Sequence, residues 1–568
     1  MKENIKTPWL EKYGDVPFNL EYPEHTMCDA VEEAASKYPK YSALAFMGRH
    51  ISYKNLVKAI DETARAFKAY GIGEGDKVTI CMPNIPQTVY CLYALNKIGA
   101  IASMIHPLSA VGEIEFYLKE VDSCCVVTID QFYDKFAEVR KNVEVKKLII
   151  ASISDELGFI KSFVYSKFTE SKFTKPQYGE DTKKWSDFIE AGKLYAGEIK
   201  VEKTDKDPAV ILFSGGTTGV TKGILLSNYN FNALAIQTAI MCNAPVCGKR
   251  MLAAMPMFHG FGLGVCVHTM LVVGGCSILV PKFNVKSYSE LIKKEKPNYI
   301  AGVPTLYEAI IRSDYLDGAD LEHLMGVFSG GDSLSIELKK KFDEFLKGHN
   351  ASVRVREGYG TTECVTACCL TPYHIEKEGS IGVPYPDTYF KICSPGTTEE
   401  VPYGTDGEIC LCGPTVMMEY INHPEETADT LKKHDDGEVW LHTGDLGYMD
   451  DEGFVYFKQR IKRMIVTSGY NVYPSQLENI IDAHEAVVMS CVIGVKDEYK
   501  IQKIKSYVVL KDGYAADDAT KQSILEHCKK HIAKYAMPYS IEFRESLPKT
   551  LVGKIAYTVL EKEANEKL

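Results

Sequence analysis

The sequence lacks the patterns that mark secreted, disulfide-linked or zinc-binding proteins. None of its 17 cysteines forms a C-x-x-C pair, and no cysteine–histidine set has the spacing of a zinc site. The start of the chain is charged and has no apolar core segment of the kind found in signal peptides. We therefore expect reduced thiols and a cytoplasmic protein.

A long uninterrupted apolar run is also missing. The longest apolar stretch, residues 262–280, contains His268 and is broken by Gly274 and Gly275, so neither half is long enough to cross a bilayer. We expect a buried helix followed by a buried strand there. The net charge of −11 argues against a general nucleic-acid-binding protein.

What is present is an ordinary globular composition in a long chain. With 568 residues, the chain exceeds the size at which one core usually stops growing. Helical spacing over 53–70, a strand over 77–82 and a second helix over 87–97 predict a parallel α/β sheet. We predict an α/β fold with a large N-terminal domain of α/β subdomains, residues 1–461, and a small C-terminal α+β domain, residues 462–568.

Residues 155–207 show no long regular period, and we interpret them as an insertion or linker. Within them, residues 157–175 mix phenylalanines with lysines. Two interpretations stay open: a helix that makes peripheral membrane contact, and a surface insertion whose aromatic rings dock on the protein.

A glycine- and threonine-rich loop follows a buried strand predicted over 209–213. The loop reads Ser214, Gly215, Gly216, Thr217, Thr218, Gly219, Val220, Thr221, Lys222, Gly223. Glycines let the backbone approach a ligand, hydroxyls add donors and the lysine adds charge, which is a phosphate-binding composition. It is not a Walker A loop, because glycine follows the lysine and the next segment looks like strand. Taken alone, it also fits a glycine-rich hairpin without a ligand.

Five motifs in order carry a family resemblance. They are the loop 214–223, Gly-Tyr-Gly-Thr-Thr-Glu at 358–363, His-Thr-Gly-Asp at 442–445, Gln-Arg-Ile-Lys at 459–462 and Pro-Lys-Thr-Leu-Val-Gly-Lys at 548–554. Over nearly its whole length the chain resembles the adenylate-forming superfamily of acyl-CoA synthetases, luciferases and peptide-synthetase adenylation domains. The resemblance implies two half-reactions. An acid and Mg-ATP give an acyl-adenylate and pyrophosphate, and the thiol of coenzyme A then displaces AMP.

This chemistry explains why no Ser/His/Asp set is apparent. A carboxylate is already an ionised nucleophile at neutral pH, so the first step needs no general base. The obstacle is repulsion between the carboxylate and the polyphosphate, so catalysis must come from positioning and charge neutralisation.

The resemblance implies roles at the reacting centre. Lys554 would bridge the substrate carboxylate and the α-phosphate, and Thr362 would contact that phosphate. Glu363 would help to bind Mg²⁺. Lys462 matches the hinge about which the small domain rotates between the half-reactions.

The resemblance also implies a nucleotide site. Tyr359 would stack on adenine, Gly331 and Asp332 would line the adenine edge, and Asp445 would accept hydrogen bonds from the ribose, with Arg460 nearby. The β- and γ-phosphates would lie against Ser214, Gly215, Gly216, Thr217, Thr218, Gly219 and Lys222.

The acid is less well defined by the sequence. His259 matches the position where amino-acid-activating relatives place an aspartate, which argues against an amino acid, and we assign it with Gly360 to the substrate site. A packed structural histidine is the alternative. The chain ends 14 residues after Lys554, so we expect a free acceptor, coenzyme A. The loop variants Gly215 and Thr221 are similar to those of long-chain fatty-acyl-CoA ligases.

Four hypotheses follow. The first is an acyl-CoA ligase for medium- to long-chain fatty acids, and the second is the same chemistry on an aromatic or other acid. The third is a non-catalytic acyl-AMP- or ATP-binding relative, and the fourth is a luciferase-type oxygenase. The chain departs from the family pattern at Gln459, Arg463, Val552 and Tyr557, which bears on how the small domain docks.

Overall fold

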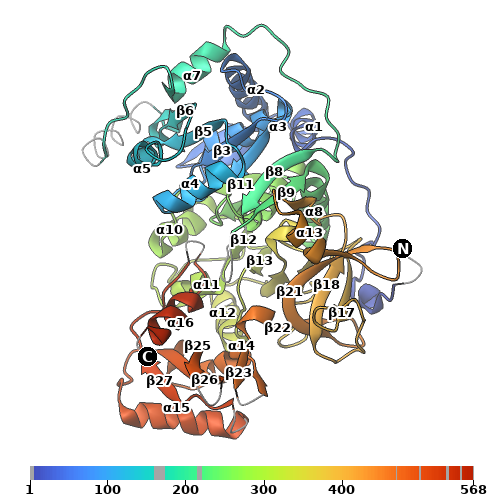
Figure 1. Ribbon diagram of the computed structural model, residues 1–568, viewed down its shortest axis with the longest axis vertical. Helices are drawn as coiled ribbons and strands as arrows, with labels where there is room; N and C mark the ends of the chain where they lie inside the picture. The colour runs from blue at the N-terminus through green and yellow to red at the C-terminus, as the bar shows by residue number, and fades with distance from the viewer. Residues whose placement is uncertain are drawn as a thin grey trace.

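The computed structural model describes residues 5–158, 173–213, 221–467, 470–497, 501–532, 536–550 and 553–566. Two mixed sheets and an antiparallel β unit form a large N-terminal domain, and a fourth sheet forms a small C-terminal domain (Figure 1). This arrangement confirms the predicted α/β fold with a large first and a small second domain.

The first sheet has eight strands in the order β19-β9-β8-β4-β3-β5-β6-β7. The strands are β3 Lys77–Cys81, β4 Ile101–Met104, β5 Cys125–Ile129, β6 Leu148–Ala151, β7 Thr182–Lys184, β8 Pro208–Phe213, β9 Gly223–Ser227 and β19 Glu419–Tyr420. Their helices are α2 Tyr53–Ala69, α3 Pro86–Lys97, α4 Val111–Glu120, α5 Tyr133–Val139 and α7 Trp185–Gly192. The predicted helix–strand–helix order is confirmed by α2, β3 and α3. Leu56, Ile60, Ala64 and Phe67 of α2 are fully buried, as their spacing on one face requires.

The second sheet has nine strands in the order β16-β15-β14-β13-β12-β10-β11-β1-β2. The strands are β1 Ser42–Phe46, β2 Arg49–Ser52, β10 Arg250–Ala253, β11 Cys276–Leu279, β12 Tyr299–Gly302, β13 Gly326–Ser329, β14 Val355–Tyr359, β15 Cys369–Leu370 and β16 Val383–Pro384. The associated helices are α1 Met27–Lys37, α8 Asn228–Met241, α9 Thr269–Val272, α10 Val285–Glu295, α11 Pro304–Ile311 and α12 Ile336–Gly348. Strands β12, β13 and β14 run parallel, so their carboxyl ends meet at one edge.

The long apolar stretch forms a buried π-helix, η4 Phe261–His268, which continues into α9 and then β11. The expected buried helix followed by a buried strand is therefore confirmed. Among the described residues, no helix is long and apolar enough to cross a membrane.

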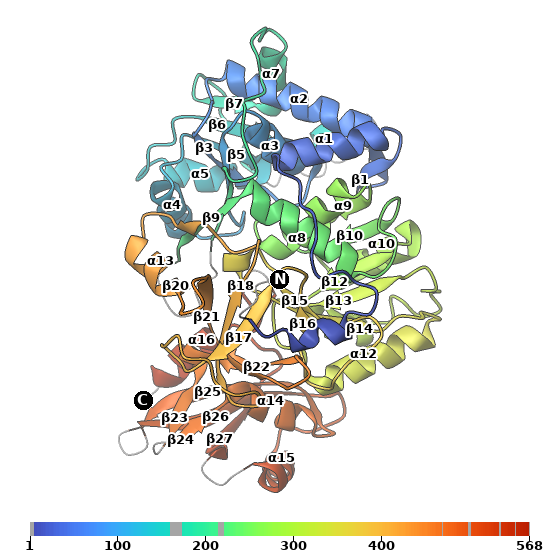
Figure 2. The same ribbon diagram turned by 90° about the vertical axis from the view of Figure 1, so that its right-hand side faces the viewer.

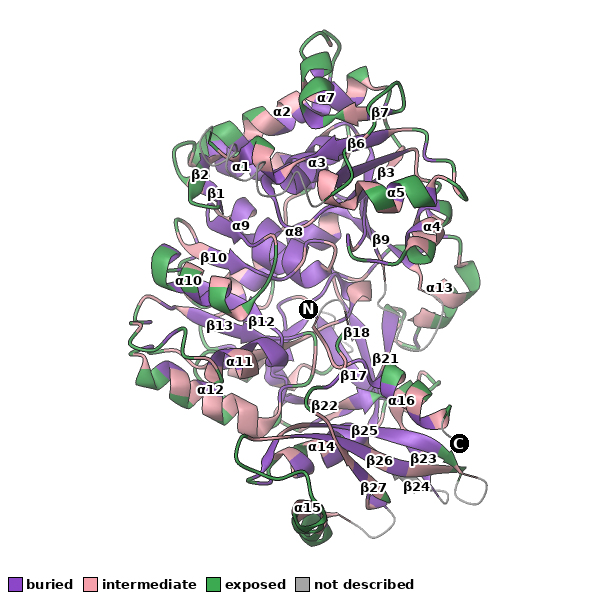
Figure 3. Cartoon of the chain, turned by 90° about the vertical axis from the view of Figure 1, so that its left-hand side faces the viewer, coloured by how far each residue is buried: buried purple, intermediate pink, exposed green. Residues whose placement is uncertain are grey.

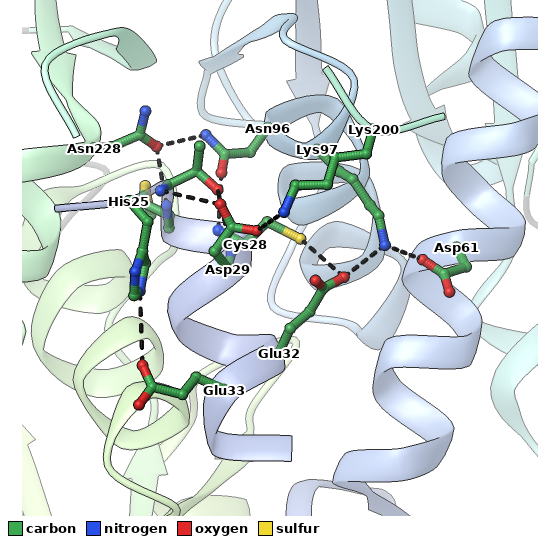
Figure 4. Close-up of polar contacts among 12 residues, drawn as sticks. His25, Cys28, Asp29, Glu32, Glu33, Asp61, Asn96, Lys97, Lys200 and Asn228 are labelled. Atoms are coloured by element: carbon green, nitrogen blue, oxygen red, sulfur yellow. Dashed lines mark hydrogen bonds and ion pairs between the residues drawn. The ribbon is translucent and has the colours of Figure 1, made fainter. Parts of the chain in front are cut away.

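Helix α1 joins the two sheets through buried polar contacts (Figure 4). The Asn228 side-chain oxygen accepts from the Met27 amide at 3.0 Å and from Asn96 at 2.8 Å. Lys97 pairs with Glu32 at 2.5 Å and also with Asp61. Because these residues lie on α1, α2, α3 and α8, the contacts fix the sheets against each other.

The remaining part of the large domain is an antiparallel unit, with strands β17 Tyr389–Cys393, β18 Gly407–Cys412, β20 Leu431–Lys433, β21 Val439–Met449 and β22 Val455–Arg460. Helix α13 Pro424–Thr430 lies beside it. The 3-10 turn η6 Ile461–Arg463 then leads into the small domain (Figure 2).

The small domain contains β23 Ile465–Thr467, β24 Tyr470–Val472, β25 Val487–Asp497, β26 Ile501–Leu510, β27 Ser540–Phe543, α14 Pro474–Asp482, α15 Asp518–His531 and α16 Tyr557–Asn565. It has a core of its own, built from residues such as Ile465, Ile481, Val492 and Val508. The predicted boundary between residues 461 and 462 falls inside η6, and we retain it as a proposal.

The region interpreted as a linker, 155–207, is more structured than the sequence indicated. Strand β7 pairs with β6 at the edge of the first sheet, and α7 packs on α2. Trp185 and Phe188 of α7 are buried, with the Phe188 ring 5.0 Å from that of Phe67. Figure 3 shows α7 beside α2, each with buried and exposed turns. Elements of three and eight residues are too short to show a period. Residues 159–172 lie outside the described residues, so the proposed membrane contact through 157–175 stays a prediction.

Candidate active site

A cavity of about 1490 Å³ opens where the large domain meets the small domain. Its walls include the ends of β13 and β14 on one side and residues of α14 and α16 on the other. The described residues that the motifs singled out all line it: Lys222, His259, Gly331, Asp332, Tyr359, Gly360, Thr362, Glu363, Asp445, Arg460, Lys462 and Lys554. The structure thus brings together side chains from motifs more than three hundred residues apart.

The glycine-rich loop connects β8 to β9, which pair as antiparallel neighbours. The strand expected after the loop is therefore present. Ser214, Gly215, Gly216, Thr217, Thr218 and Gly219 lie outside the described residues, so their assignment stays a prediction. Lys222, at the end of the loop, lies over the Tyr420 ring with its amine 4.8 Å from the ring centre.

Tyr420 also holds the carboxylate of Glu363. The Tyr420 hydroxyl donates to Glu363 Oε1 at 2.8 Å, and the Met417 amide donates to the Glu363 carbonyl at 2.8 Å. The Tyr420 side chain thus contacts both a lysine and a carboxylate at the cavity wall. Carboxylate oxygens are the ligands Mg²⁺ prefers, so Glu363 fits the metal that the family chemistry implies. The motifs did not identify Tyr420, which lies in β19, between two motifs and 57 positions after Glu363.

Asp445 is the centre of a second group. Its side chain is 1% exposed and lies opposite Arg460 across the β21–β22 pair. Arg460 Nε approaches Asp445 Oδ1 at 2.8 Å, and the Tyr359 hydroxyl donates to Asp445 Oδ2 at 2.6 Å. Burial raises the pKa of the Asp445 carboxyl, although Arg460 and Tyr359 oppose the shift. Oδ2 therefore has a hydrogen-bond donor, whereas Oδ1 has Arg460 as an ion-pair partner but accepts no hydrogen bond from the described residues.

The turn that presents Asp445 is supported from behind by Glu408, which the motifs did not identify. Glu408 Oε1 accepts from the Gly444 amide at 2.9 Å, and its other oxygen lies 2.9 Å from His442 Nδ1. Burial alone would raise the pKa of Glu408, but these hydrogen bonds outweigh it and hold the pKa below its usual range. Glu408, Cys410 and His442 bring potential metal-ligand atoms within 4.8 Å of one another. Because Glu408 and His442 satisfy each other, we interpret the group as support for the turn.

Two glycines, Gly260 next to His259 and Gly360 next to Tyr359, leave room for the backbone of the loop that follows Glu363. A Cβ at Gly260 would lie 1.6 Å from the Val365 carbonyl oxygen, and one at Gly360 would lie 1.8 Å from the Thr366 carbonyl oxygen. Val365 itself has a φ of 65°, which is unfavourable for a β-branched residue. Backbone strain of this kind collects at functional sites.

Lys554 enters the cavity from the small domain. The Thr305 hydroxyl of the large domain donates to the neighbouring Gly553 carbonyl at 2.9 Å. Lys554 Cε lies 3.6 Å from the position that a Cβ on Gly331 would occupy. Burial lowers the pKa of the Lys554 ammonium, and the Asp332 carboxylate is the strongest opposing influence. The small domain is thus oriented with its motif lysine inside the cavity.

His259 lies at the same cavity as a neutral imidazole. Burial, reinforced by the charge of Lys554, lowers its pKa to about 3. Its Nδ1 accepts from the Phe261 amide at 3.2 Å, so in the neutral ring the proton is assigned to Nε2. His259 can therefore donate a hydrogen bond without bringing a charge.

Two arginines flank the predicted hinge. Arg460 is tied to the large domain through Asp445, whereas Arg463 pairs with Glu478 of α14 at 2.5 Å. The Arg463 guanidinium also lies 4.7 Å from the centre of the Tyr557 ring in α16. Arg463 and Tyr557, both departures from the family pattern, thus contact each other. Lys462, which lies between Arg460 and Arg463 in the chain, is exposed.

Family comparisons match both parts of the chain. The AMP-binding enzyme model matches residues 31–421, and the AMP-binding enzyme C-terminal domain matches residues 476–554. A long-chain-fatty-acid–CoA ligase of Bacillus subtilis (strain 168) is 33% identical over 575 residues, covering 98% of each chain. A ligase of the same name from Yersinia pestis is 31% identical, again covering 98% of each chain.

Solved structures agree with the fold. ATP-bound MatB from Rhodopseudomonas palustris has a TM-score of 0.80 at 25% identity, covering 94% of this chain and 98% of that one. The anthranilate CoA ligase AuaEII, in complex with anthranoyl-AMP, has a TM-score of 0.83 at 23% identity and covers 98% and 99%. The chain belongs to the AMP-binding enzyme family and is an AMP-forming acid–CoA ligase, whose substrates are ATP, coenzyme A and a small-molecule carboxylic acid.

Proposed function

We propose that this ligase activates medium- to long-chain fatty acids, first as acyl-adenylates formed from Mg-ATP and then as CoA thioesters. The observation that carries the proposal is the buried part of the cavity wall, where uncharged side chains of the large domain gather. These are Thr238, Cys242, Val246, Met251, Val265, Met270, Tyr299 and Phe328. An acyl chain needs such a wall, because each methylene that leaves water contributes about 0.8 kcal/mol.

The electrostatics favour an acid whose tail carries no charge. His259 is neutral and no carboxylate stands in its place to pair with an amine. The full-length likeness to long-chain-fatty-acid–CoA ligases supports the same substrate class.

The proposed first step depends on neutralising charge. Lys554 would hold the substrate carboxylate against the α-phosphate, with Thr362 beside it, and Lys222 would face the outer phosphates. Glu363 would hold Mg²⁺, which when bound supplies positive charge at the phosphates. Asp445 and Tyr359 would hold the nucleoside.

A second candidate is the same ligation on an aromatic acid. A probable 4-coumarate–CoA ligase 3 of Dictyostelium discoideum is 29% identical and covers 100% of this chain and 99% of its own. Aromatic side chains at Tyr299 and Phe328 would suit a planar acid as well as an aliphatic one.

A panel of acids separates the two candidates. Acetate, octanoate, dodecanoate, palmitate, oleate and cinnamate are each supplied with ATP, Mg²⁺ and coenzyme A, and pyrophosphate release is measured. We expect kcat/KM to rise about fourfold per methylene, as 0.8 kcal/mol each implies, until the cavity is filled. A preference for cinnamate or acetate would overturn the fatty-acid assignment.

Replacement of Lys554 tests the proposed chemistry. Lys554→Ala should abolish adenylate formation yet leave thioester formation from supplied dodecanoyl-AMP and coenzyme A largely intact. Lys562→Ala, an exposed lysine on α16, is the matched control and should leave both steps unchanged. Equal loss of both steps in Lys554→Ala would refute the role.

A further inference from the structure

The loop after β13 places an acidic side chain where the small domain meets the large one. Asp332 follows Gly331, whose φ is 82°, and accepts a hydrogen bond from the Ser333 amide at 3.0 Å. The Lys554 side chain passes beside this turn, with its Cε 3.6 Å from the position of a Cβ on Gly331. Asp332 and Lys554 thus face the same part of the cavity from opposite domains.

A second cation of the small domain, Arg463, lines the same cavity and already contacts Glu478 and the Tyr557 ring. Lys554 is therefore the cation of the small domain that is placed to use the Asp332 carboxylate.

The other charged groups around Lys554 cannot replace Asp332. Asp445 already pairs with Arg460 and binds the Tyr359 hydroxyl. Arg460 repels the Lys554 ammonium, and His259 is neutral. Among the groups that act on Lys554, Asp332 is thus the uncommitted counter-charge.

We propose that Asp332 is a positioning residue for adenylate formation, whose carboxylate seats the small domain by attracting Lys554 at the reacting centre. This inference rests on the proposed role of Lys554. It differs from a contact with the adenine edge, because the charge that Asp332 would attract belongs to Lys554 of the small domain. When the small domain rotates for the second step, Lys554 leaves and Asp332 no longer contributes.

The test compares Asp332→Asn with the wild-type enzyme in each half-reaction. Asparagine keeps an acceptor for the Ser333 amide and removes only the charge. With ATP and dodecanoate, or whichever acid the panel identifies, we expect adenylate formation to slow by about tenfold or more. Thioester formation from the supplied acyl-adenylate should stay within about twofold of wild type, because Lys554 no longer lies beside Asp332 in that step.

The pH profile distinguishes this role from a structural one. Adenylate formation needs protonated Lys554, so its rate falls at high pH as that lysine deprotonates. Removing the Asp332 charge lowers the pKa of Lys554 further, so the alkaline limb of the profile should move to lower pH. Asp332→Glu should restore both rate and profile. Glu344→Gln, which removes an exposed charge on α12, should change neither.

Three outcomes would overturn the proposal: equal loss of both half-reactions, an unmoved alkaline limb, or a raised KM for ATP as the sole effect, which indicates an adenine contact. If Lys554→Ala forms adenylate at the wild-type rate, the proposed role of Lys554 is wrong. If Lys554→Ala forms no adenylate but Asp332→Asn forms it at the wild-type rate, only the role of Asp332 is wrong.

Discussion

Side chains outside the motifs hold the motif residues in place. Tyr420 donates to Glu363 and lies under Lys222, and Glu408 holds the turn that carries Asp445. Such contacts are worth about 1.5–3 kcal/mol each when one partner is charged. At the scale of residues, the arrangement of the site therefore depends on positions that no motif marks.

Tyr420→Phe separates the two contacts of this ring. The variant loses the hydrogen bond to Glu363 but keeps an aromatic face for Lys222. We expect adenylate formation to slow by about tenfold, corresponding to about 1.4 kcal/mol, together with a higher Mg²⁺ requirement. A Mg²⁺ titration of pyrophosphate release measures both. An unchanged Mg²⁺ requirement would show that the hydroxyl does not orient the Glu363 carboxylate.

Glu408→Gln should lower stability in a pH-dependent way. The pKa of Glu408 is depressed in the folded protein, so its contribution is present above the unfolded pKa and disappears as pH falls through the folded pKa. We expect a loss of about 2 kcal/mol at pH 7 that shrinks below about pH 4. Unfolding midpoints from pH 7 to pH 3.5 measure it, with the exposed Glu425→Gln as control. A difference that stays constant with pH would contradict the assigned ionisation.

At the scale of elements, the approach of three segments shapes the site. The segment before η4, the end of β14 and the strained turn at Val365 meet with no room for a Cβ at Gly260 or Gly360. The sequence predicted η4 and β11 from an apolar run, and it marked the end of β14 by a motif, because both signals are local. It did not predict this contact, which joins residues about a hundred positions apart.

Gly260→Ala tests that contact. The added methyl meets a backbone oxygen, which cannot move as a side chain can, so we expect about 3 kcal/mol of destabilisation and a displaced His259. Thermal unfolding and the KM for the acid measure the two effects. Gly348→Ala, in α12 with nothing within 4 Å, should be neutral or stabilising by about 0.5–1 kcal/mol. Wild-type stability and KM in Gly260→Ala would refute the close packing.

At the scale of the whole molecule, the predicted hinge lies between two arginines that are each held by an ion pair. Arg460 belongs to the large domain and Arg463 to the small one, so rotation between them must be absorbed at Ile461 and Lys462. A few residues that change φ and ψ are sufficient for such a domain movement.

Lys462→Pro tests the rotation. Proline holds φ near −65°, which a 3-10 turn tolerates, and restricts the residue before it. We expect adenylate formation to fall only slightly and thioester formation to fall by about a hundredfold, since the second orientation needs different dihedral angles. Single-turnover assays of each half-reaction measure this, with Lys462→Ala as control. Unchanged thioester formation in the proline variant would count against the hinge.

The sequence by itself determined the family, the two-domain α/β fold and the motif residues of the cavity wall, because these depend on local motifs and on their order along the chain. Only the tertiary structure revealed Tyr420 behind Glu363, Glu408 behind Asp445, and the approach of Lys554 to the turn that carries Asp332. These pairings depend on how separate sheets and domains pack, and no spacing along one chain encodes a contact across that distance.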